Sequence, residues 1–233
     1  MKVVVIISAN GEWKAVKSLF PESKIEGSPF GEKFDVTLEQ RMLTFFHGGW
    51  GKVSAAASTQ FVIDHVHPDL IVNLGTCGGF LDRIELGIII LVDRTIIYDI
   101  VEQMTDADEA IDHYTVKLDL NWLPRVTPSP VARGLMVSAD RDIMVEDITK
   151  LITKYDAVAA DWESGAIAWV AQRNNQRLLI LRGVSDLVGG EGGEVYGDYE
   201  LFMGRTKEIM RRLIDILPKW LTGIEKIQLG YRV

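Results

Sequence analysis

Five apolar runs in this sequence are continuous rather than alternating, and this pattern constrains the fold more than any other feature. The runs occupy residues 2–8, 69–75, 87–93, 133–139 and 177–185. Stretches rich in Val, Ile and Leu suit strands that are covered on both faces, as in a mostly parallel sheet. We therefore predict a central sheet with other elements packed on both of its sides.

Helical patterns alternate with these runs. Residues 52–66 carry three consecutive alanines, which suit close packing of a helix on a sheet, and residues 199–221 repeat apolar side chains at helical spacing. Residues 146–154 and 163–174 are two further predicted helices. Strands that alternate with helices indicate the α/β class.

Two regions interrupt this alternation. We expect a hairpin-like excursion over residues 21–41. Residues 99–130 are acidic in their first half and contain prolines near their end. Because long loops in compact domains are more often lids or interface elements than simple connections, we expect one of these roles for residues 99–130.

Length and charge limit the function classes. With 233 residues and 47% hydrophobic content, the chain can form one large, well-buried domain, and we expect a single domain over residues 1–233. The formal net charge of −8 argues against nucleic acid as a partner, because phosphate binding needs a clustered excess of Lys and Arg. A small-molecule substrate fits this balance better.

Cysteine content and hydropathy indicate the compartment. A single cysteine, Cys77, cannot form an internal disulfide, so nothing indicates an oxidising compartment. The apolar run Val3–Ile7 is too short for a signal peptide, and no segment approaches the ~18 apolar residues of a membrane span. We expect a soluble, cytoplasmic protein without a membrane partner.

A glycine-rich turn, residues 48–52, separates an apolar strand from the 52–66 helix. It loosely resembles a dinucleotide-binding fingerprint, and Asp69 follows at about the expected distance of ~20 residues. However, Asp69 precedes its strand, whereas a ribose-binding acid belongs at the strand's C-terminal end. The turn, which includes Trp50, is either a tight strand-to-helix connection or, as we favour, a wall of a substrate site.

A second glycine cluster, residues 75–79, ends the strand predicted at 69–75. α/β sheets place ligands at such strand ends. Its glycines allow close approach of backbone amides to a ligand, and Thr76 adds a hydroxyl group. The cluster lacks the Gly-Lys-Ser/Thr of a phosphate-binding loop, so it is either a substrate-contacting turn or a plain loop.

Three acidic residues follow predicted strands: Glu12, Glu163 and Asp186. Glu163 has the simpler interpretation of a first-turn acid favoured by the helix dipole, and Asp186 that of a helix cap. Burial at the end of an apolar strand would instead raise the pKa of Asp186 toward that of a general acid. We expect the three acids to meet at one edge of the sheet.

Six segments together resemble the nucleoside phosphorylase superfamily, and more closely its methylthioadenosine/S-adenosylhomocysteine nucleosidase branch. They occur in family order over most of the chain: the opening strand with Glu12, GWGKVSAAAS (49–58), HPDLIVNLGTCGGF (67–80), RGLMVSAD (133–140), ADWESGAIA (160–168) and LLILRGVSD (178–186). The resemblance implies a three-layer α/β/α sandwich around a central mixed, mostly parallel sheet. It also implies hydrolysis of the bond between a purine and ribose, without a cofactor or a metal.

The resemblance assigns roles to individual residues. Asp186 would protonate the purine at N7, Glu12 would orient and deprotonate water, and Glu163 would bind the ribose hydroxyls and stabilise positive charge on the sugar. The expected substrate-binding residues are Trp162 against the ribose, Thr76 and Arg182 around the water or anion, Ser185 orienting Asp186, and also Gly78, Ile143 and Tyr196.

The sequence departs from the family pattern at three binding positions. Trp162 replaces a usual methionine, and Trp50 replaces a small aliphatic residue that lines the pocket for the 5′ substituent. Asp142 stands where an aromatic ring stacks on adenine, so it either accepts a hydrogen bond from a base amino group or faces solvent. We expect a 5′-modified purine nucleoside such as methylthioadenosine or S-adenosylhomocysteine as substrate, with the base and the 5′ group left open.

Three alternative functions also fit parts of the sequence. A phosphorylase would use phosphate as the nucleophile, but Asn73 replaces the arginine of the phosphorylase branch and Glu12 would repel an anion, which favours water. A non-catalytic purine-binding module and a dinucleotide-dependent oxidoreductase are further alternatives. Family members are commonly dimers or hexamers, so we expect a homo-oligomer.

Overall fold

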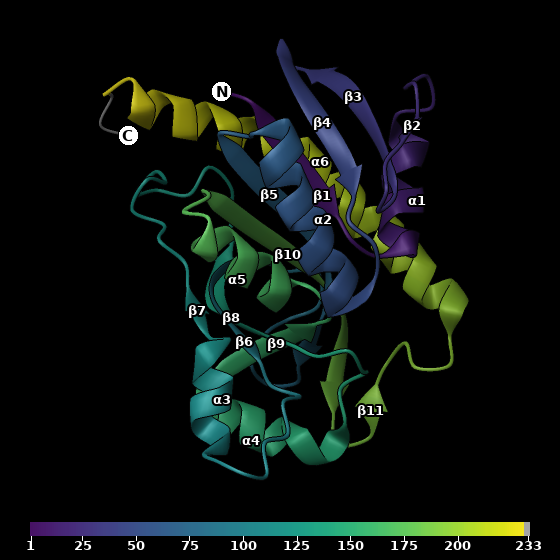
Figure 1. Cartoon of the computed structure of the whole chain (residues 1–233). Coiled ribbons are helices and arrows are strands. Elements are labelled where there is room, and N and C mark those ends of the chain that lie inside the picture. Colours follow the sequence, from purple (N-terminus) through teal and green to yellow (C-terminus); the bar gives the residue numbers. More distant parts are fainter. Residues whose placement is uncertain (231–233) are drawn as a thin grey trace.

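Strands and helices alternate along the chain in the computed structural model, which describes residues 1–230 (Figure 1). The strands are β1 (Val3–Ile7), β2 (Glu26–Gly27), β3 (Glu32–Leu38), β4 (Arg41–His47), β5 (Leu70–Phe80), β6 (Ile89–Ile97), β7 (Val116–Lys117), β8 (Ala132–Ser138), β9 (Ala157–Asp161), β10 (Leu178–Gly189) and β11 (Gly192–Gly193). The helices are α1 (Asn10–Leu19), α2 (Gly51–Val66), α3 (Ala107–His113), α4 (Val145–Tyr155), α5 (Ser164–Arg173) and α6 (Tyr199–Gln228).

All of these strands belong to one mixed sheet, in which β5 is the hub. β5 pairs in parallel with β1 and β10 and antiparallel with β9. The strand order is β11-β10-β6-β8-β9-β5-β1-β4-β3-β2, with β7 paired to β6. Because β10 also pairs with both β5 and β6, strands β5, β10, β6, β8 and β9 form a closed ring of pairings.

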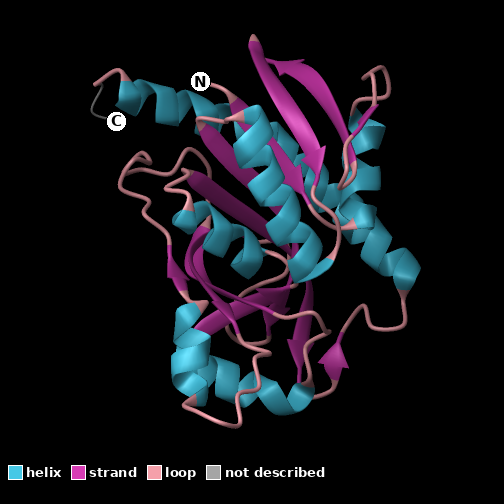
Figure 2. Ribbon diagram, viewed as in Figure 1, coloured by secondary structure: helices cyan, strands magenta, loops and turns pink. Residues whose placement is uncertain are grey.

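Helices cover both faces of the sheet, as the continuous apolar runs predict. Val3, Val5 and Ile7 of β1 share a buried cluster with α1 and α6. Val4 and Ile6 of the same strand face a second buried cluster that includes residues of α2 and α5. A strand whose side chains are buried on both faces needs apolar residues at every position. The three-layer α/β fold is therefore confirmed (Figure 2).

Several predicted strand ends were wrong, including the end predicted at residue 93, since β6 continues to Ile97. β5 continues through Phe80, so residues 75–79 lie within a strand and not in a turn. β10 continues to Gly189 through a register shift between Val184 and Asp186, so Asp186 lies inside the strand beside this bulge. β5 and β10 pair with each other along this whole extension. That hydrogen-bonded ladder offsets the low strand propensity of the glycines, which sequence patterns cannot reveal.

The two irregular regions contain more secondary structure than their sequences suggest. Residues 21–41 hold β2 and β3, and an antiparallel hairpin joins β3 to β4 through Glu39 and Gln40, which have positive φ. Residues 99–130 contain α3 and β7. Within residues 1–230, no helix combines the length and the apolar character that a membrane span requires.

Contact between α6 and β10 fixes the strand that carries Arg182 and Asp186. Gly183 of β10 lies so close to α6 that an added Cβ would overlap the Ile209 side chain. We predict that Gly183→Ala lowers the free energy of unfolding by roughly 1–3 kcal/mol, because Ile209 cannot move away within a packed core. Urea denaturation would measure this change.

Two companion variants isolate the cause. Gly183→Ala combined with Ile209→Ala should destabilise the protein by less than the sum of the two single changes. Gly204→Ala, in the same helix with no atom within 4 Å of the added Cβ, should be neutral or stabilising by about 0.5–1 kcal/mol. Additive effects in the double variant would contradict the proposed overlap.

Candidate active site

A cavity of about 570 Å³ opens where the N-terminal ends of α1, α2 and α5 meet β5, β10 and the segment that leads into α6. Its walls include every binding or catalytic residue expected from the sequence except Arg182, which lies beneath the floor. These cavity residues are Glu12, Trp50, Thr76, Gly78, Asp142, Ile143, Trp162, Glu163, Ser185, Asp186 and Tyr196. The fold therefore brings together residues that are far apart in the sequence.

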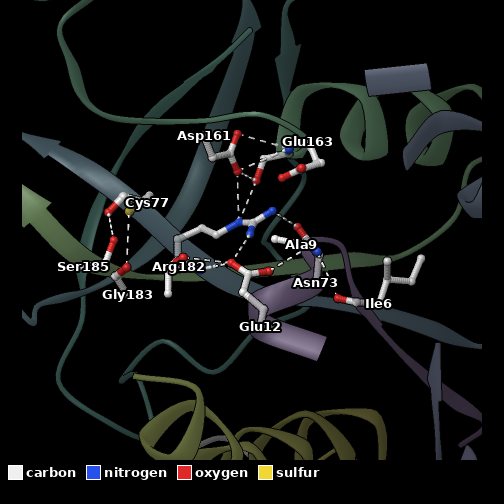
Figure 3. Close-up of polar contacts among 12 residues, drawn as sticks. Ile6, Ala9, Glu12, Asn73, Cys77, Asp161, Glu163, Arg182, Gly183 and Ser185 are labelled. Atoms are coloured by element: carbon white, nitrogen blue, oxygen red, sulfur yellow. Dashed lines mark hydrogen bonds and ion pairs between the residues drawn. The ribbon is translucent and has the colours of Figure 1, made fainter. Parts of the chain in front are cut away.

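Arg182 is the centre of the polar network under this cavity, and its side chain is completely buried (Figure 3). Its Nε lies 3.0 Å from Asp161 Oδ2 and donates to Ser164 Oγ at 3.0 Å. Its Nη2 donates to Asn73 Oδ1 at 2.9 Å. Its Nη1 lies 3.7 Å from Glu12 Oε1. A fully buried charge is tolerated only when ion pairs and hydrogen bonds of this kind compensate it.

Gly75 makes room for this network. A Cβ at Gly75 would overlap Arg182 Nη1 and would lie 2.7 Å from Glu12 Oε1. The absence of a side chain at this point of β5 therefore lets the guanidinium and the carboxylate approach each other. The glycines of residues 75–79 were predicted to form either a ligand-contacting turn or a plain loop, and for Gly75 the structure shows a different reason.

Glu12 lies in the first turn of α1 and is almost fully buried. Its Oε1 accepts two hydrogen bonds from Thr76, at 2.6 Å from the backbone N and 2.9 Å from Oγ1. Its Oε2 accepts one longer bond, 3.3 Å, from Ala9 N. Burial raises the pKa of Glu12, although Arg182 and Thr76 act in the opposite direction. Oε2 thus accepts fewer hydrogen bonds than Oε1.

Glu163 precedes α5 but makes no side-chain cap to its own helix. Instead, its Oε1 accepts a hydrogen bond of 3.1 Å from the backbone N of Gly51, at the start of α2. Burial raises its pKa to about 8; Arg182 lowers the pKa, whereas Asp161 and Glu12 raise it. The first-turn interpretation of Glu163 is therefore insufficient, because its partner comes from a different helix.

Asp161 is a site residue that the sequence analysis did not single out. It ends β9, lines the cavity, and accepts hydrogen bonds from Ser138 Oγ at 2.6 Å and from the Ser164 hydroxyl. It also forms the closest ion pair with Arg182. Its position at a strand end is the same signal that identified the other acids, and it would have justified including Asp161.

Asp186 lies in a separate part of the cavity. Its Oδ1 accepts a hydrogen bond of 2.8 Å from Ser185 Oγ, and burial raises its pKa, opposed by this hydrogen bond and by Arg205. Asp186 is within a strand, so the helix-cap interpretation was wrong. Glu194 and Asp142 raise this pKa further, whereas Arg182, Asp161 and Glu12 are prominent among the charges that act on Glu163. The main charges acting on the two acids therefore differ.

Two tryptophans form one wall beside Glu163. The rings of Trp50 and Trp162 stack with centroids 4.9 Å apart and an interplanar angle of 27°. Trp50 immediately precedes Gly51, the donor to Glu163, and its side chain remains 61% exposed. At the other end of the cavity, Asp142 is exposed at the rim and the Tyr196 hydroxyl accepts a hydrogen bond from Ile143 N.

Comparisons with known proteins found similar sequences and structures. The sequence profile of the phosphorylase superfamily matches residues 2–218. The chain is 28% identical over 201 residues to 5′-methylthioadenosine/S-adenosylhomocysteine nucleosidase of Staphylococcus saprophyticus, covering 78% of this chain and 83% of that protein. It is 26% identical over 215 residues to the protein of the same name from Marinomonas sp., covering 85% and 92%.

Solved structures share the fold. A Streptococcus pneumoniae MTA/SAH nucleosidase in complex with 8-aminoadenine superposes with a TM-score of 0.76 at 19% identity, covering 96% of this chain and 100% of that one. A Helicobacter pylori nucleosidase variant with 5′-methylthioadenosine in its active site gives a TM-score of 0.74 at 14% identity, covering 93% and 99%.

The raised pKa of Glu163 makes stability depend on pH. Because the folded state binds this proton more tightly than the unfolded state, the associated stability is present below pH 4.5 and is lost as pH rises through about 8. We predict that Glu163→Gln reduces the loss of unfolding free energy between pH 5 and 8. The part of that loss due to Glu12 should remain.

Urea midpoints at several pH values would test this prediction. Glu85→Gln, which changes an exposed glutamate outside the cavity, serves as the control and should follow the wild type. If Glu163→Gln and the wild type lost stability equally over this pH range, the assignment of a raised pKa to Glu163 would be wrong.

Proposed function

The chain belongs to the phosphorylase superfamily, and we propose that it is a nucleosidase that hydrolyses the N-ribosidic bond of a 5′-modified purine nucleoside. The observation that carries this proposal is the pair of carboxyl groups, Asp186 and Glu163, buried at two ends of one cavity with raised pKa values. The names of the similar proteins, methylthioadenosine/S-adenosylhomocysteine nucleosidases, support the same substrate class.

Asp186 is the proposed general acid. Cleavage of an N-ribosidic bond leaves charge on the departing base, so protonating the base at N7 lowers the barrier. Asp186 suits this role because burial keeps it protonated at a higher pH than an exposed aspartate, while Ser185 fixes its orientation. Gly78 adjoins this acid, because a Cβ added at Gly78 would lie 3.6 Å from Asp186 Oδ2.

Glu163 is the proposed sugar-binding acid. As the bond breaks, positive charge develops on the sugar, and an adjacent carboxylate stabilises that charge. The same positive charge favours the ionised form of Glu163, so its pKa falls as the transition state forms. The hydrogen bond from Gly51 N holds one oxygen, which leaves the other for a ribose hydroxyl.

Glu12 is the proposed base that takes a proton from the attacking water. Two bonds from Thr76 occupy its Oε1, so Oε2 is the oxygen available to water. A carboxylate with a raised pKa is also a stronger base than an ordinary glutamate. Phosphate is disfavoured as nucleophile because the carboxylates of Glu12 and Asp161 line the cavity and would repel a dianion.

Assembly and location belong to the same proposal. We propose one catalytic domain that functions as a homo-oligomer in the cytoplasm. The family resemblance supports an oligomer, because members of this superfamily are commonly dimers or hexamers. Val53, Val101 and Met104, which are 80%, 80% and 90% exposed, are apolar side chains that a subunit interface would cover.

Purine release tests the function directly. We predict that the wild type releases adenine from 5′-methylthioadenosine and that added phosphate does not change the rate. Asp186→Asn should lower kcat by roughly 10²–10⁴-fold, because a carboxamide cannot donate the proton. Glu12→Gln should cause a similar loss.

The controls separate chemistry from folding. Asp112→Asn, on the exposed side of α3, should retain wild-type turnover, and circular dichroism should show that all variants are folded. The absence of base release from any purine nucleoside would disprove the nucleosidase proposal, and a strict requirement for phosphate would replace it with a phosphorylase.

The stacked tryptophans predict a preference among 5′ substituents. Trp50 and Trp162 flank the proposed sugar-binding acid, so a substituent extending past Glu163 meets aromatic faces. We predict that Trp50→Ile raises KM for 5′-phenylthioadenosine several-fold more than for 5′-methylthioadenosine, because only the phenyl group loses a stacking partner. Equal changes in KM for the two nucleosides would show that Trp50 does not contact the substituent.

A further inference from the structure

Tyr196 occupies a hydrogen-bonding site inside the cavity. Its hydroxyl accepts a hydrogen bond of 3.0 Å from Ile143 N and donates one of 3.4 Å to Ile143 O. Both residues line the cavity, and the Ile143 side chain is buried. One hydroxyl therefore engages the backbone donor and the backbone acceptor of the same residue.

The edge of a nucleobase presents a hydrogen-bond donor next to a hydrogen-bond acceptor. On adenine, an amino group lies next to a ring nitrogen, so one edge can donate to a carbonyl and accept from an N–H at the same time. A tyrosine hydroxyl offers the same two functions from a single atom. In this structure, the Tyr196 hydroxyl thus forms the hydrogen bonds with Ile143 N and O that a base edge would otherwise form.

This backbone pair lies beside the proposed general acid. A Cβ built on Gly78 would lie 3.1 Å from Ile143 Cδ1 and 3.6 Å from Asp186 Oδ2. Gly78 therefore lies beside both residues, and all three line the same cavity. A base that binds the Ile143 main chain from the cavity would lie near Asp186.

Tyr196 lies in a turn between β11 and α6. Gly197, the next residue, has a φ of 83°, a region that other residues rarely adopt, whereas Gly192 on the other side belongs to β11 and pairs with Gly189 of β10. The Tyr196 ring packs against Gly193, where an added Cβ would come within 2.6 Å of the ring. Tyr196 remains 44% exposed, so part of the residue is already in contact with solvent.

We propose that the Tyr196 hydroxyl is an internal competitor of the base: it holds the Ile143 donor–acceptor pair in the free protein and is displaced when a base binds there. This inference rests on the proposed function, because it requires a purine site in this cavity. Tyr196 therefore determines binding specificity, because a base must form stronger hydrogen bonds to Ile143 N and O than the tyrosine hydroxyl forms. A ligand without an adjacent donor and acceptor does not compete with the hydroxyl.

Ligand affinities of Tyr196→Phe provide the test. The variant keeps the ring on Gly193 but removes the competing hydroxyl, so it should bind adenine roughly 3- to 10-fold more tightly than the wild type. Binding of 5-methylthioribose, which carries the sugar portion without a base, should be unchanged. Tyr114→Phe, which removes a hydroxyl at the C-cap of α3, should leave both affinities unchanged.

Calorimetric titration distinguishes the outcomes. Weaker or unchanged adenine binding by Tyr196→Phe would overturn the inference while leaving the nucleosidase proposal intact. Failure of adenine to bind either protein would remove the base site itself, and with it both proposals. A structure of the adenine complex adds a second readout: the inference requires that Tyr196 Oη no longer contacts Ile143, and a retained contact would disprove it.

Discussion

The buried guanidinium of Arg182 is the constraint on which the site depends. A fully buried cation is stable only if nearby groups compensate its charge and its hydrogen-bonding capacity. Asp161, Ser164 and Asn73 provide direct contacts, and Glu12 lies 3.7 Å from its remaining nitrogen. These partners come from β9, α5, β5 and α1, so the elements of the site must be positioned around one side chain.

This arrangement also explains how several acids of one cavity acquire different properties. More carboxyl groups than cations lie around Arg182, which together with burial favours the protonated form of Glu163. Asp186 lies beside Gly78, and the main charges that act on it are Arg205, Glu194 and Asp142. One end of the cavity therefore suits proton donation to a base, and the other suits the sugar and water. Trp50 and Trp162 alter the substrate wall without entering this network.

The sequence predicted the core and most of the cavity, because continuous apolar runs and acids after strands are local patterns. It did not predict the bulge at Asp186 or the strand character of residues 75–79, since both depend on pairing between β5 and β10. The contacts of Gly75 with Arg182 and of Tyr196 with Ile143 join residues 107 and 53 positions apart and have no local signature. Asp161 was predictable from its position at a strand end.

Burial, together with the nearby carboxyl groups of Asp161 and Glu12, keeps the Glu163 carboxyl group protonated at neutral pH although Arg182 favours its ionised form. Carbon-13 NMR of the glutamate side-chain carboxyls, assigned with Glu163→Gln, measures this directly as a function of pH. The account predicts that the Glu163 resonance titrates near pH 8. A Glu163 resonance that titrates near its ordinary value of 4.5 would contradict it.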